Sequence, residues 1–173
     1  HQSNNGLHFF MLGRMDTEGY KQKGFDTLLN ALPLVAEQML QSNAKITIVG
    51  NGNCFEAFKQ QITKYSFINL IPSLTHQQTL SYLQQTDVVL LPSLYEGVSM
   101  FALEALATGN AVVYSQTGGL IDMVDGNGYL IEPKNYSQLA KAILALINEP
   151  DLTALKKQST QIALKKYHPQ IQL

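Results

Sequence analysis

The chain has 173 residues, of which 45% are hydrophobic and 14% are charged, and its formal net charge is −1 at pH 7. This length suffices for one globular domain with a substantial core, and the near-neutral charge gives no reason to expect a nucleic-acid partner. The single cysteine, Cys54, excludes an internal disulfide bond and a cysteine-based metal cluster. We expect neither a membrane span nor a signal peptide, because the sequence contains no apolar run or flanking pattern of either kind.

Apolar runs alternate with helical periodicity along the first half of the chain. Residues 1–6 are polar and start without a methionine, so we expect a disordered or tag-derived segment in a piece of a longer protein, and one domain over residues 7–173. The predicted strands cover residues 7–12, 45–49 and 67–71, and the predicted helices cover residues 24–40, 54–64 and 75–85. A polar loop is predicted over residues 15–23. Pro33 is expected to kink or break its helix, and Thr75 is expected to be an N-cap.

The second half continues the alternation. The predicted strands cover residues 87–91, 111–115 and 129–131, and the predicted helices cover residues 98–107, 120–124, 136–147 and 151–166. Asn135 or Ser137 is expected to begin the third of these helices. Such alternation predicts a single α/β domain with a doubly wound, Rossmann-like parallel sheet and helices on both faces. Its ligands should bind beyond the carboxyl ends of the strands.

The segment from Pro92 to Gly119 carries the main functional signal. Glu96 precedes the predicted helix 98–107, which is apolar almost all round, and Glu104 lies inside it. An ionised carboxylate on a buried helix is costly without a partner, so Glu104 needs either a protein donor or a ligand hydroxyl. The strand–turn–helix layout also aims free backbone N–H groups at one point, which suits an anion.

This segment, PSLYEGVSMFALEALATGNAVV, resembles the paired-glutamate motif of retaining glycosyltransferases of family 4, with seven residues between Glu96 and Glu104. The resemblance extends over about residues 7–147. It implies the C-terminal, donor-binding half of a two-domain GT-B fold, with acceptor binding supplied by an N-terminal domain. It also implies a hexosyltransferase activity, the transfer of a sugar from a UDP-, GDP- or ADP-sugar to an acceptor hydroxyl with retention of configuration. The resemblance implies no metal and no other cofactor, and the fragment alone is expected to be inactive.

The resemblance also implies roles for individual residues. The catalytic residues are Glu96, which contacts or electrostatically supports the transferring sugar, and Arg14 and Lys23, which bind the diphosphate. Lys21 is an alternative to Lys23, because the loop between Gly13-Arg14 and Lys23-Gly24 is longer than usual in the family. Glu104 would accept hydrogen bonds from the ribose hydroxyls. The other donor-binding residues lie in three loops that follow strands: Gly97, Val98, Ser99 and Met100; Gly50, Asn51 and Gly52; Ser73 and Leu74.

Two other functions stay open on the sequence. One is a nucleotide-sugar-binding or regulatory module without catalysis, and the other is a phosphorylase or epimerase on a related fold. The base, the sugar and the acceptor are not identified by the sequence. The family implies a cytoplasmic protein, with peripheral attachment to the cytoplasmic face of a membrane through the other domain as an option.

Two weaker patterns are set aside. The run from Gly50 to Phe55 imitates a dinucleotide-binding fingerprint, but Phe55 stands where the third glycine belongs and Asn69 replaces the acidic ribose ligand, so no nicotinamide or flavin is predicted. The acidic run Asp16-Thr17-Glu18 is in the wrong place for a paired-acid metal motif. The histidines are scattered and are interpreted as ordinary surface or core residues, so no metal site is predicted: His8, His76 and His168.

Overall fold

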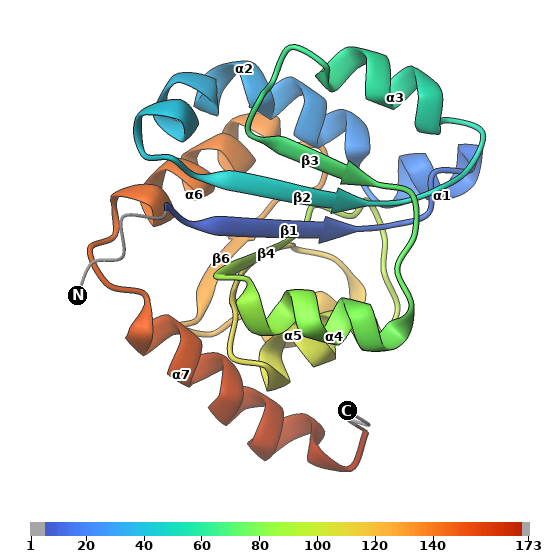
Figure 1. Cartoon of the computed structure of the whole chain (residues 1–173). Coiled ribbons are helices and arrows are strands. Elements are labelled where there is room, and N and C mark those ends of the chain that lie inside the picture. Colours follow the sequence, from blue (N-terminus) through green and yellow to red (C-terminus); the bar gives the residue numbers. More distant parts are fainter. Residues whose placement is uncertain (1–5, 171–173) are drawn as a thin grey trace.

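Six parallel strands form the central sheet of the structure, a computed structural model that describes residues 6–170 (Figure 1). In chain order the strands are β1 (His8–Leu12), β2 (Lys45–Val49), β3 (Ile68–Ile71), β4 (Val88–Leu91), β5 (Ala111–Ser115) and β6 (Gly128–Ile131). Their order in the sheet is β3-β2-β1-β4-β5-β6, and every neighbouring pair is parallel. The predicted doubly wound sheet is therefore confirmed, and the strand order reverses between β1 and β4, where such sheets bind ligands.

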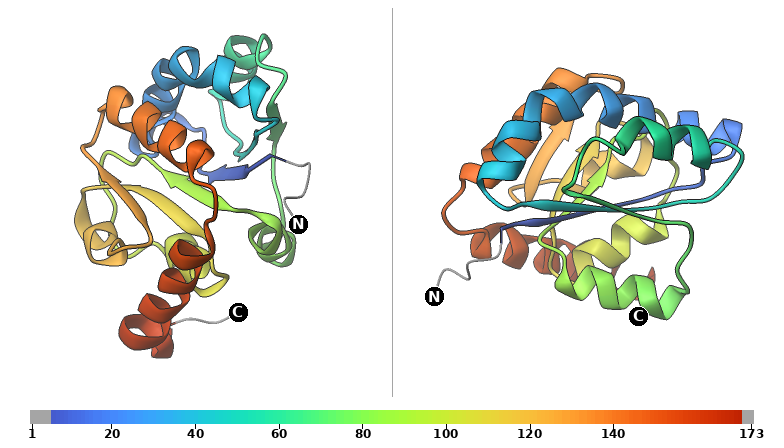
Figure 2. Two further views of the ribbon diagram at one scale, coloured as in Figure 1. Left: turned by 90° about the vertical axis from the view of Figure 1, so that its left-hand side faces the viewer. Right: turned by 45° about the horizontal axis from the view of Figure 1, so that its top comes forward.

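Helices cover both faces of the sheet. They are α1 (Thr17–Gln22), α2 (Phe25–Gln41), α3 (Phe55–Ile62), α4 (His76–Gln85), α5 (Met100–Ala107), α6 (Tyr136–Asn148) and α7 (Thr153–Ile162). Shorter turns are the 3-10 helix η1 (Gly118–Met123), the π-helical η2 (Ala163–Tyr167) and η3 (His168–Gln170). Figure 2 shows α2 and α6 on one side of the sheet and α5 and α7 on the other. None of the described helices is both long enough and apolar enough to cross a bilayer.

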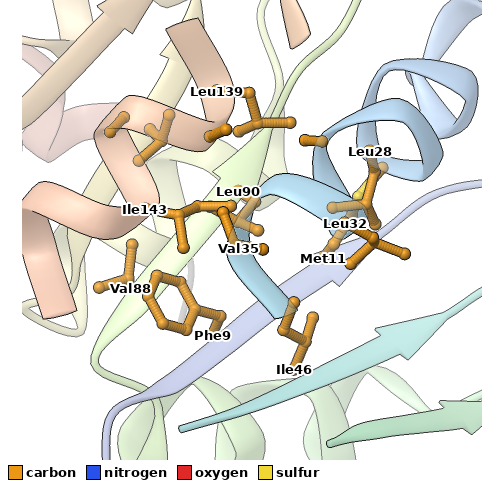
Figure 3. Packing of buried hydrophobic residues seen from close by; sticks show 14 of the residues in the cluster. Phe9, Met11, Leu28, Leu32, Val35, Ile46, Val88, Leu90, Leu139 and Ile143 are labelled. Carbon is orange, nitrogen blue, oxygen red and sulfur yellow. The ribbon is translucent and has the colours of Figure 1, made fainter. Parts of the chain in front are cut away.

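The strands alternate their side chains between two apolar clusters. Phe9 and Met11 of β1 enter the cluster beneath α2 and α6, whereas Phe10 between them enters the cluster beneath α4 and α5. Figure 3 shows the first cluster, in which Val35 of α2 and Ile143 of α6 lie over the strands. Because the central strands β1 and β4 are buried on both faces, residues 9–12 and 88–91 read as continuous apolar runs in the sequence.

The boundaries of several elements differ from the prediction. The polar loop predicted over residues 15–23 is wrong, because α1 forms there and its Tyr20 ring stacks on Phe25 with centroids 5.3 Å apart. The predicted break at Pro33 does not occur, since α2 continues through this residue, which lies on its exposed face. The helix predicted to start at residue 98 starts at Met100, with Ser99 as its N-cap. The expectation for residues 1–6 falls, apart from Gly6, outside the described residues.

Two predicted caps are confirmed. The hydroxyl of Thr75 accepts the N–H of Gln78 at 3.1 Å, while the Gln78 side chain accepts the N–H of Thr75 at 2.9 Å, a complete capping box at the start of α4. Asn135 caps α6 by accepting the N–H of Gln138 at 2.9 Å, so Asn135 rather than Ser137 begins that helix.

The Thr75→Ala substitution is expected to lower the free energy of unfolding by about 1 kcal/mol, because it removes the side-chain acceptor from the first turn of α4. Urea denaturation measures the change. Thr63→Ala is the control, since the Thr63 hydroxyl donates to the carbonyl of Lys59 on an exposed face, and its effect is expected to stay within about 0.5 kcal/mol. Equal losses in the two variants would show that the cap adds nothing.

Candidate functional site

The loops that follow β1, β2, β3 and β4 lie at one edge of the sheet, because parallel strands end on the same side. The ends of β1, β2 and β3 point to the right of Figure 1, where α1 also lies. The loop after β1 runs over residues 13–16, and the loop between β4 and α5 runs over residues 92–99. These two loops flank the point at which the strand order reverses, and they carry five of the predicted site residues.

Lys23 and Glu96 form an ion pair at this point. The Nζ of Lys23 donates to Oε1 of Glu96 in a close contact and to Oε2 at 3.2 Å. The pair is largely buried, with 19% of the Lys23 side chain and 5% of the Glu96 side chain exposed. The structure therefore brings together two predicted residues that are 73 positions apart in the sequence. An ammonium group has three N–H donors, so one remains for a ligand when two serve Glu96.

Close packing of the loops holds Lys23 in place. A Cβ at Gly13 would lie 2.6 Å from Cγ of Lys23, so the absence of a side chain at Gly13 makes room for the lysine stem. The N–H of Leu94 donates to the carbonyl of Gln22 at 2.8 Å, which ties the β4–α5 loop to the end of α1.

Burial raises the pKa of Tyr20 on α1, and the Asp26 carboxylate raises it further, so this phenol stays neutral.

Lys21 occupies a different environment from Lys23. It lines a cavity of about 350 Å³ together with Gly24, Thr27, Leu94 and Lys134. Its side chain is exposed, and no ion pair to Glu96 is found for it within residues 6–170. The geometry thus favours Lys23 over Lys21 as the cation beside Glu96.

Arg14 lies at the end of β1 and is exposed. Its side chain is 66% exposed, and its Nε lies 3.8 Å from Oδ1 of Asp16. Over the described part of the chain, Arg14 makes no hydrogen bond or ion pair to the β4–α5 loop, so the structure does not join it to the Lys23–Glu96 pair. A guanidinium with a single long ion contact keeps its paired donors for a ligand such as phosphate.

The first turn of α5 presents backbone donors beside Glu96. The Ser99 hydroxyl accepts the N–H of Ala102 at 3.1 Å and so caps one of the free groups. The N–H groups of Val98, Ser99 and Met100 have no acceptor anywhere in residues 6–170. Val98 and Met100 are 66% and 45% exposed, so an anion could approach these donors from solvent.

Two glycines, Gly24 and Gly118, lie in close contact with the backbone of the loop that carries Glu96. Gly118 has a φ of 50°, and a Cβ there would overlap the carbonyl oxygen of Glu96. Gly24 has a φ of 76°, and a Cβ there would overlap the carbonyl oxygen of Pro92. The N–H of Gly119 also donates to the carbonyl of Gly97 at 3.2 Å. The β4–α5 loop is therefore clamped between the start of α2 and the start of η1.

Glu104 finds its partner in a histidine. Its side chain is 8% exposed, and its Oε1 lies 2.7 Å from Nε2 of His76, the first residue of α4. The need for a partner is thus met by a protein donor, and His76, which was interpreted as an ordinary surface or core histidine, supplies it from an exposed position. The two residues are 28 positions apart and belong to different strand–helix units, so the sequence alone carried no signal for their contact.

The backbone of α5 is fixed from the sheet side. The hydroxyl of Tyr114 on β5 donates to the carbonyl of Ala102 at 3.0 Å, and full burial raises the pKa of this phenol well above its ordinary value. The Thr108 hydroxyl donates to the carbonyl of Glu104 at 2.8 Å. These bonds hold the turn of α5 that carries Glu104 in one position.

The loops after β2 and β3 differ in how closely they pack against the loop after β1. Gly50 and Gly52 pack against the loop after β1, where a Cβ on either would overlap its backbone, and the carbonyl of Asn51 accepts the N–H of Met15 at 2.9 Å. Their observed role is this packing, and a direct role in donor binding stays a prediction. Ser73 is exposed and Leu74 is half-buried in the loop after β3, immediately before the helix that carries His76.

Comparison with known proteins gives matches over most of the chain. The family described as Glycosyl transferases group 1 matches residues 6–149. The chain is 31% identical over 140 residues to an uncharacterised glycosyltransferase of Methanocaldococcus jannaschii, covering 74% of this chain and 33% of that protein. It is 29% identical over 144 residues to a glycogen synthase of Mycobacterium tuberculosis, covering 80% of this chain and 33% of that protein. The chain thus spans about a third of the length of these two relatives.

Solved structures match the fold. The C-terminal domain of a glycosyl transferase group 1 family protein, LpcC, from Francisella tularensis superposes with a TM-score of 0.80 at 24% identity, covering 94% of this chain and 87% of that one. HepE from Anabaena, solved with UDP and glucose, superposes with a TM-score of 0.77 at 21% identity, covering 94% of this chain and 45% of that one. The chain therefore belongs to the glycosyl transferases group 1 family and has the Rossmann-like fold of a GT-B C-terminal domain.

Proposed function

We propose that this chain is the donor-binding half of an enzyme that transfers a sugar from a nucleoside-diphosphate-sugar to an acceptor hydroxyl with retention of configuration. The observation that carries the proposal is the Lys23–Glu96 pair beside the unpaired amides of Val98–Met100, at the point where the strand order reverses. Acceptor binding is assigned to a separate N-terminal domain, because the matched relatives are about three times as long as the matched segment. The proposed location is the cytoplasm or the cytoplasmic face of a membrane.

In the proposed complex, the diphosphate lies against the first turn of α5. The amides of Val98, Ser99 and Met100 and the third donor of Lys23 face the phosphate oxygens, and Arg14 closes on them from the other side. Glu96 lies at the sugar end of this group, where its charge supports the positive character that develops on the sugar. Fixed donors of this kind stabilise the negative charge of a leaving group as its bond breaks.

In the proposed reaction, the bond between the anomeric carbon and the phosphate oxygen breaks, and the nucleoside diphosphate leaves with the electron pair. The acceptor oxygen forms its bond to the same face of the anomeric carbon, and its proton passes to the departing phosphate. No obligate protein nucleophile is invoked. The reaction as proposed uses no metal and no cofactor besides the sugar nucleotide.

The nucleoside end is assigned to Glu104 and to the loop that contains Ser73 and Leu74. UDP, GDP and ADP are the candidate nucleotides. UDP is the first to test, because HepE of Anabaena and TarM of S. aureus were both solved with UDP and share this fold at TM-scores of 0.77.

A thermal-shift series with UDP-, GDP- and ADP-sugars tests the proposal on this chain. A ligand at about 100 times its dissociation constant stabilises the folded state by about 2.7 kcal/mol, which for a domain of this size raises the melting temperature by about 5–10 °C. We expect such a shift for at least one nucleotide, and none for inorganic phosphate at the same concentration. The absence of a shift with every nucleoside diphosphate would refute the donor site, and sugar transfer by the isolated chain would refute the need for a second domain.

A further inference from the structure

The contact between His76 and Glu104 gives the proposed nucleoside site a residue that no sequence motif indicated. We propose that His76 is a positioning residue: it holds one carboxylate oxygen of Glu104 so that the other is presented to a ribose hydroxyl of the sugar nucleotide. This inference rests on the proposed function. It makes His76 a determinant of the preference for ribonucleotides over deoxyribonucleotides.

The position of His76 is set by the start of α4. The capping box between Thr75 and Gln78 fixes the first turn of this helix, and His76 is its first residue. The same turn follows directly on Ser73 and Leu74, the loop assigned to the nucleoside end of the donor. The imidazole therefore reaches Glu104 from a rigid element at the nucleoside end of the site.

The chemistry of the two side chains determines which of them donates the hydrogen bond. An ionised carboxylate only accepts hydrogen bonds, so His76 must donate from Nε2 to Oε1 of Glu104 across the 2.7 Å contact. A neutral ring with its proton on Nε2 makes this bond, and so does a protonated ring. The contact therefore does not depend on a change in protonation.

The two side chains differ sharply in exposure. Glu104 is 8% exposed and His76 is 62% exposed, so an imidazole that is open to solvent contacts a carboxylate that is almost fully buried. No other hydrogen bond to the Glu104 carboxylate is found in residues 6–170. A buried carboxylate that loses its donor is left desolvated without a compensating hydrogen bond, so the orientation of Glu104 depends on His76.

The arrangement predicts that the affinity for a nucleotide depends on a ribose hydroxyl. With Oε1 engaged by His76, Oε2 has no hydrogen-bond partner within residues 6–170 and is the oxygen left to accept from a sugar hydroxyl. A site built to bond a hydroxyl rejects the analogue that lacks it, because its own polar group is then left unpaired. Loss of His76 should therefore weaken ribonucleotide binding more than 2′-deoxyribonucleotide binding.

Calorimetry with His76→Leu and His76→Gln tests the inference, using UDP and 2′-deoxy-UDP, or the GDP or ADP pair if the unmodified chain prefers that base. His76→Leu is expected to weaken UDP binding by about tenfold or more and 2′-deoxy-UDP binding by less than about threefold. His76→Gln keeps an N–H donor at a similar reach and is expected to stay within about threefold of the unmodified chain for both ligands. Gln77→Leu, at the next exposed position of α4, is the control and should change neither constant.

The outcomes separate the two proposals. If the unmodified chain binds no nucleotide, the proposed function fails and this inference fails with it. If the unmodified chain binds but His76→Leu keeps both affinities, the positioning role alone is overturned. Equal weakening of UDP and 2′-deoxy-UDP by both His76 variants would also overturn it, since that pattern reports a general disturbance of α4.

Discussion

Replacing Glu96 by glutamine in the full-length protein is expected to lower kcat/KM for sugar transfer by about 10²–10³-fold. Glutamine preserves the shape of the side chain and removes its charge, so the sugar would lose the proposed electrostatic support and Lys23 loses its counter-charge. Because only 19% of the Lys23 side chain is exposed, the loss of its carboxylate partner also leaves a poorly solvated ammonium group. The melting temperature must therefore be measured with the rate.

Two variants control the Glu96 experiment. Glu56→Gln removes a carboxylate from an exposed position of α3 and should leave both rate and stability unchanged. The double variant Lys23→Met with Glu96→Gln removes both charges, and it should be at least as stable as Glu96→Gln alone while remaining inactive. Normal transfer by Glu96→Gln would exclude the catalytic role. Donor binding without transfer by the unmodified full-length protein would favour the non-catalytic binding module.

The fold was predictable because its central strands are buried on both faces. Phe9 and Phe10 point into opposite apolar clusters, so no polar residue follows His8 within β1, and β4 repeats the pattern with Val88 and Val89. Continuous apolar runs of this kind, separated by helical periods, leave few architectures other than a parallel sheet. The Glu96–Glu104 segment then placed a candidate site at the carboxyl edge of the sheet, where the loop after β4 lies.

The elements that were missed depend on contacts between distant segments. Helix α1 has six residues, too few to show a helical period, and it is held by stacking of Tyr20 on Phe25 of the next helix. The spacing alone could not decide whether Lys21 or Lys23 faces Glu96. Residues two apart near a helix end point in different directions, and only the packing of distant segments fixes which direction leads to Glu96. His76 was missed because its partner, Glu104, lies across the boundary between two strand–helix units.

Gly118→Ala is expected to damage both stability and donor binding, because it acts on the loop that carries Glu96. Its φ of 50° is unfavourable for alanine by about 1–2 kcal/mol, and the added Cβ would overlap the carbonyl oxygen of Glu96. Overpacking of this kind costs a further 1–3 kcal/mol or so, for a total of about 2–5 kcal/mol in the free energy of unfolding. Relief of the overlap requires the backbone at Glu96 to move, which should break the Lys23–Glu96 contact and weaken nucleotide binding by about tenfold or more.

Gly109→Ala separates backbone strain from overlap. Gly109 has a φ of 76°, but a Cβ there would lie 3.8 Å from its nearest neighbour, the carbonyl oxygen of Lys156, so only the conformational cost of about 1–2 kcal/mol applies. Gly109 follows the far end of α5, and its variant should bind nucleotide normally. Urea denaturation and calorimetry on the two variants measure both effects. If Gly118→Ala lost no more stability than Gly109→Ala and bound nucleotide with unchanged affinity, close contact with η1 could not be what holds the Glu96 loop in place.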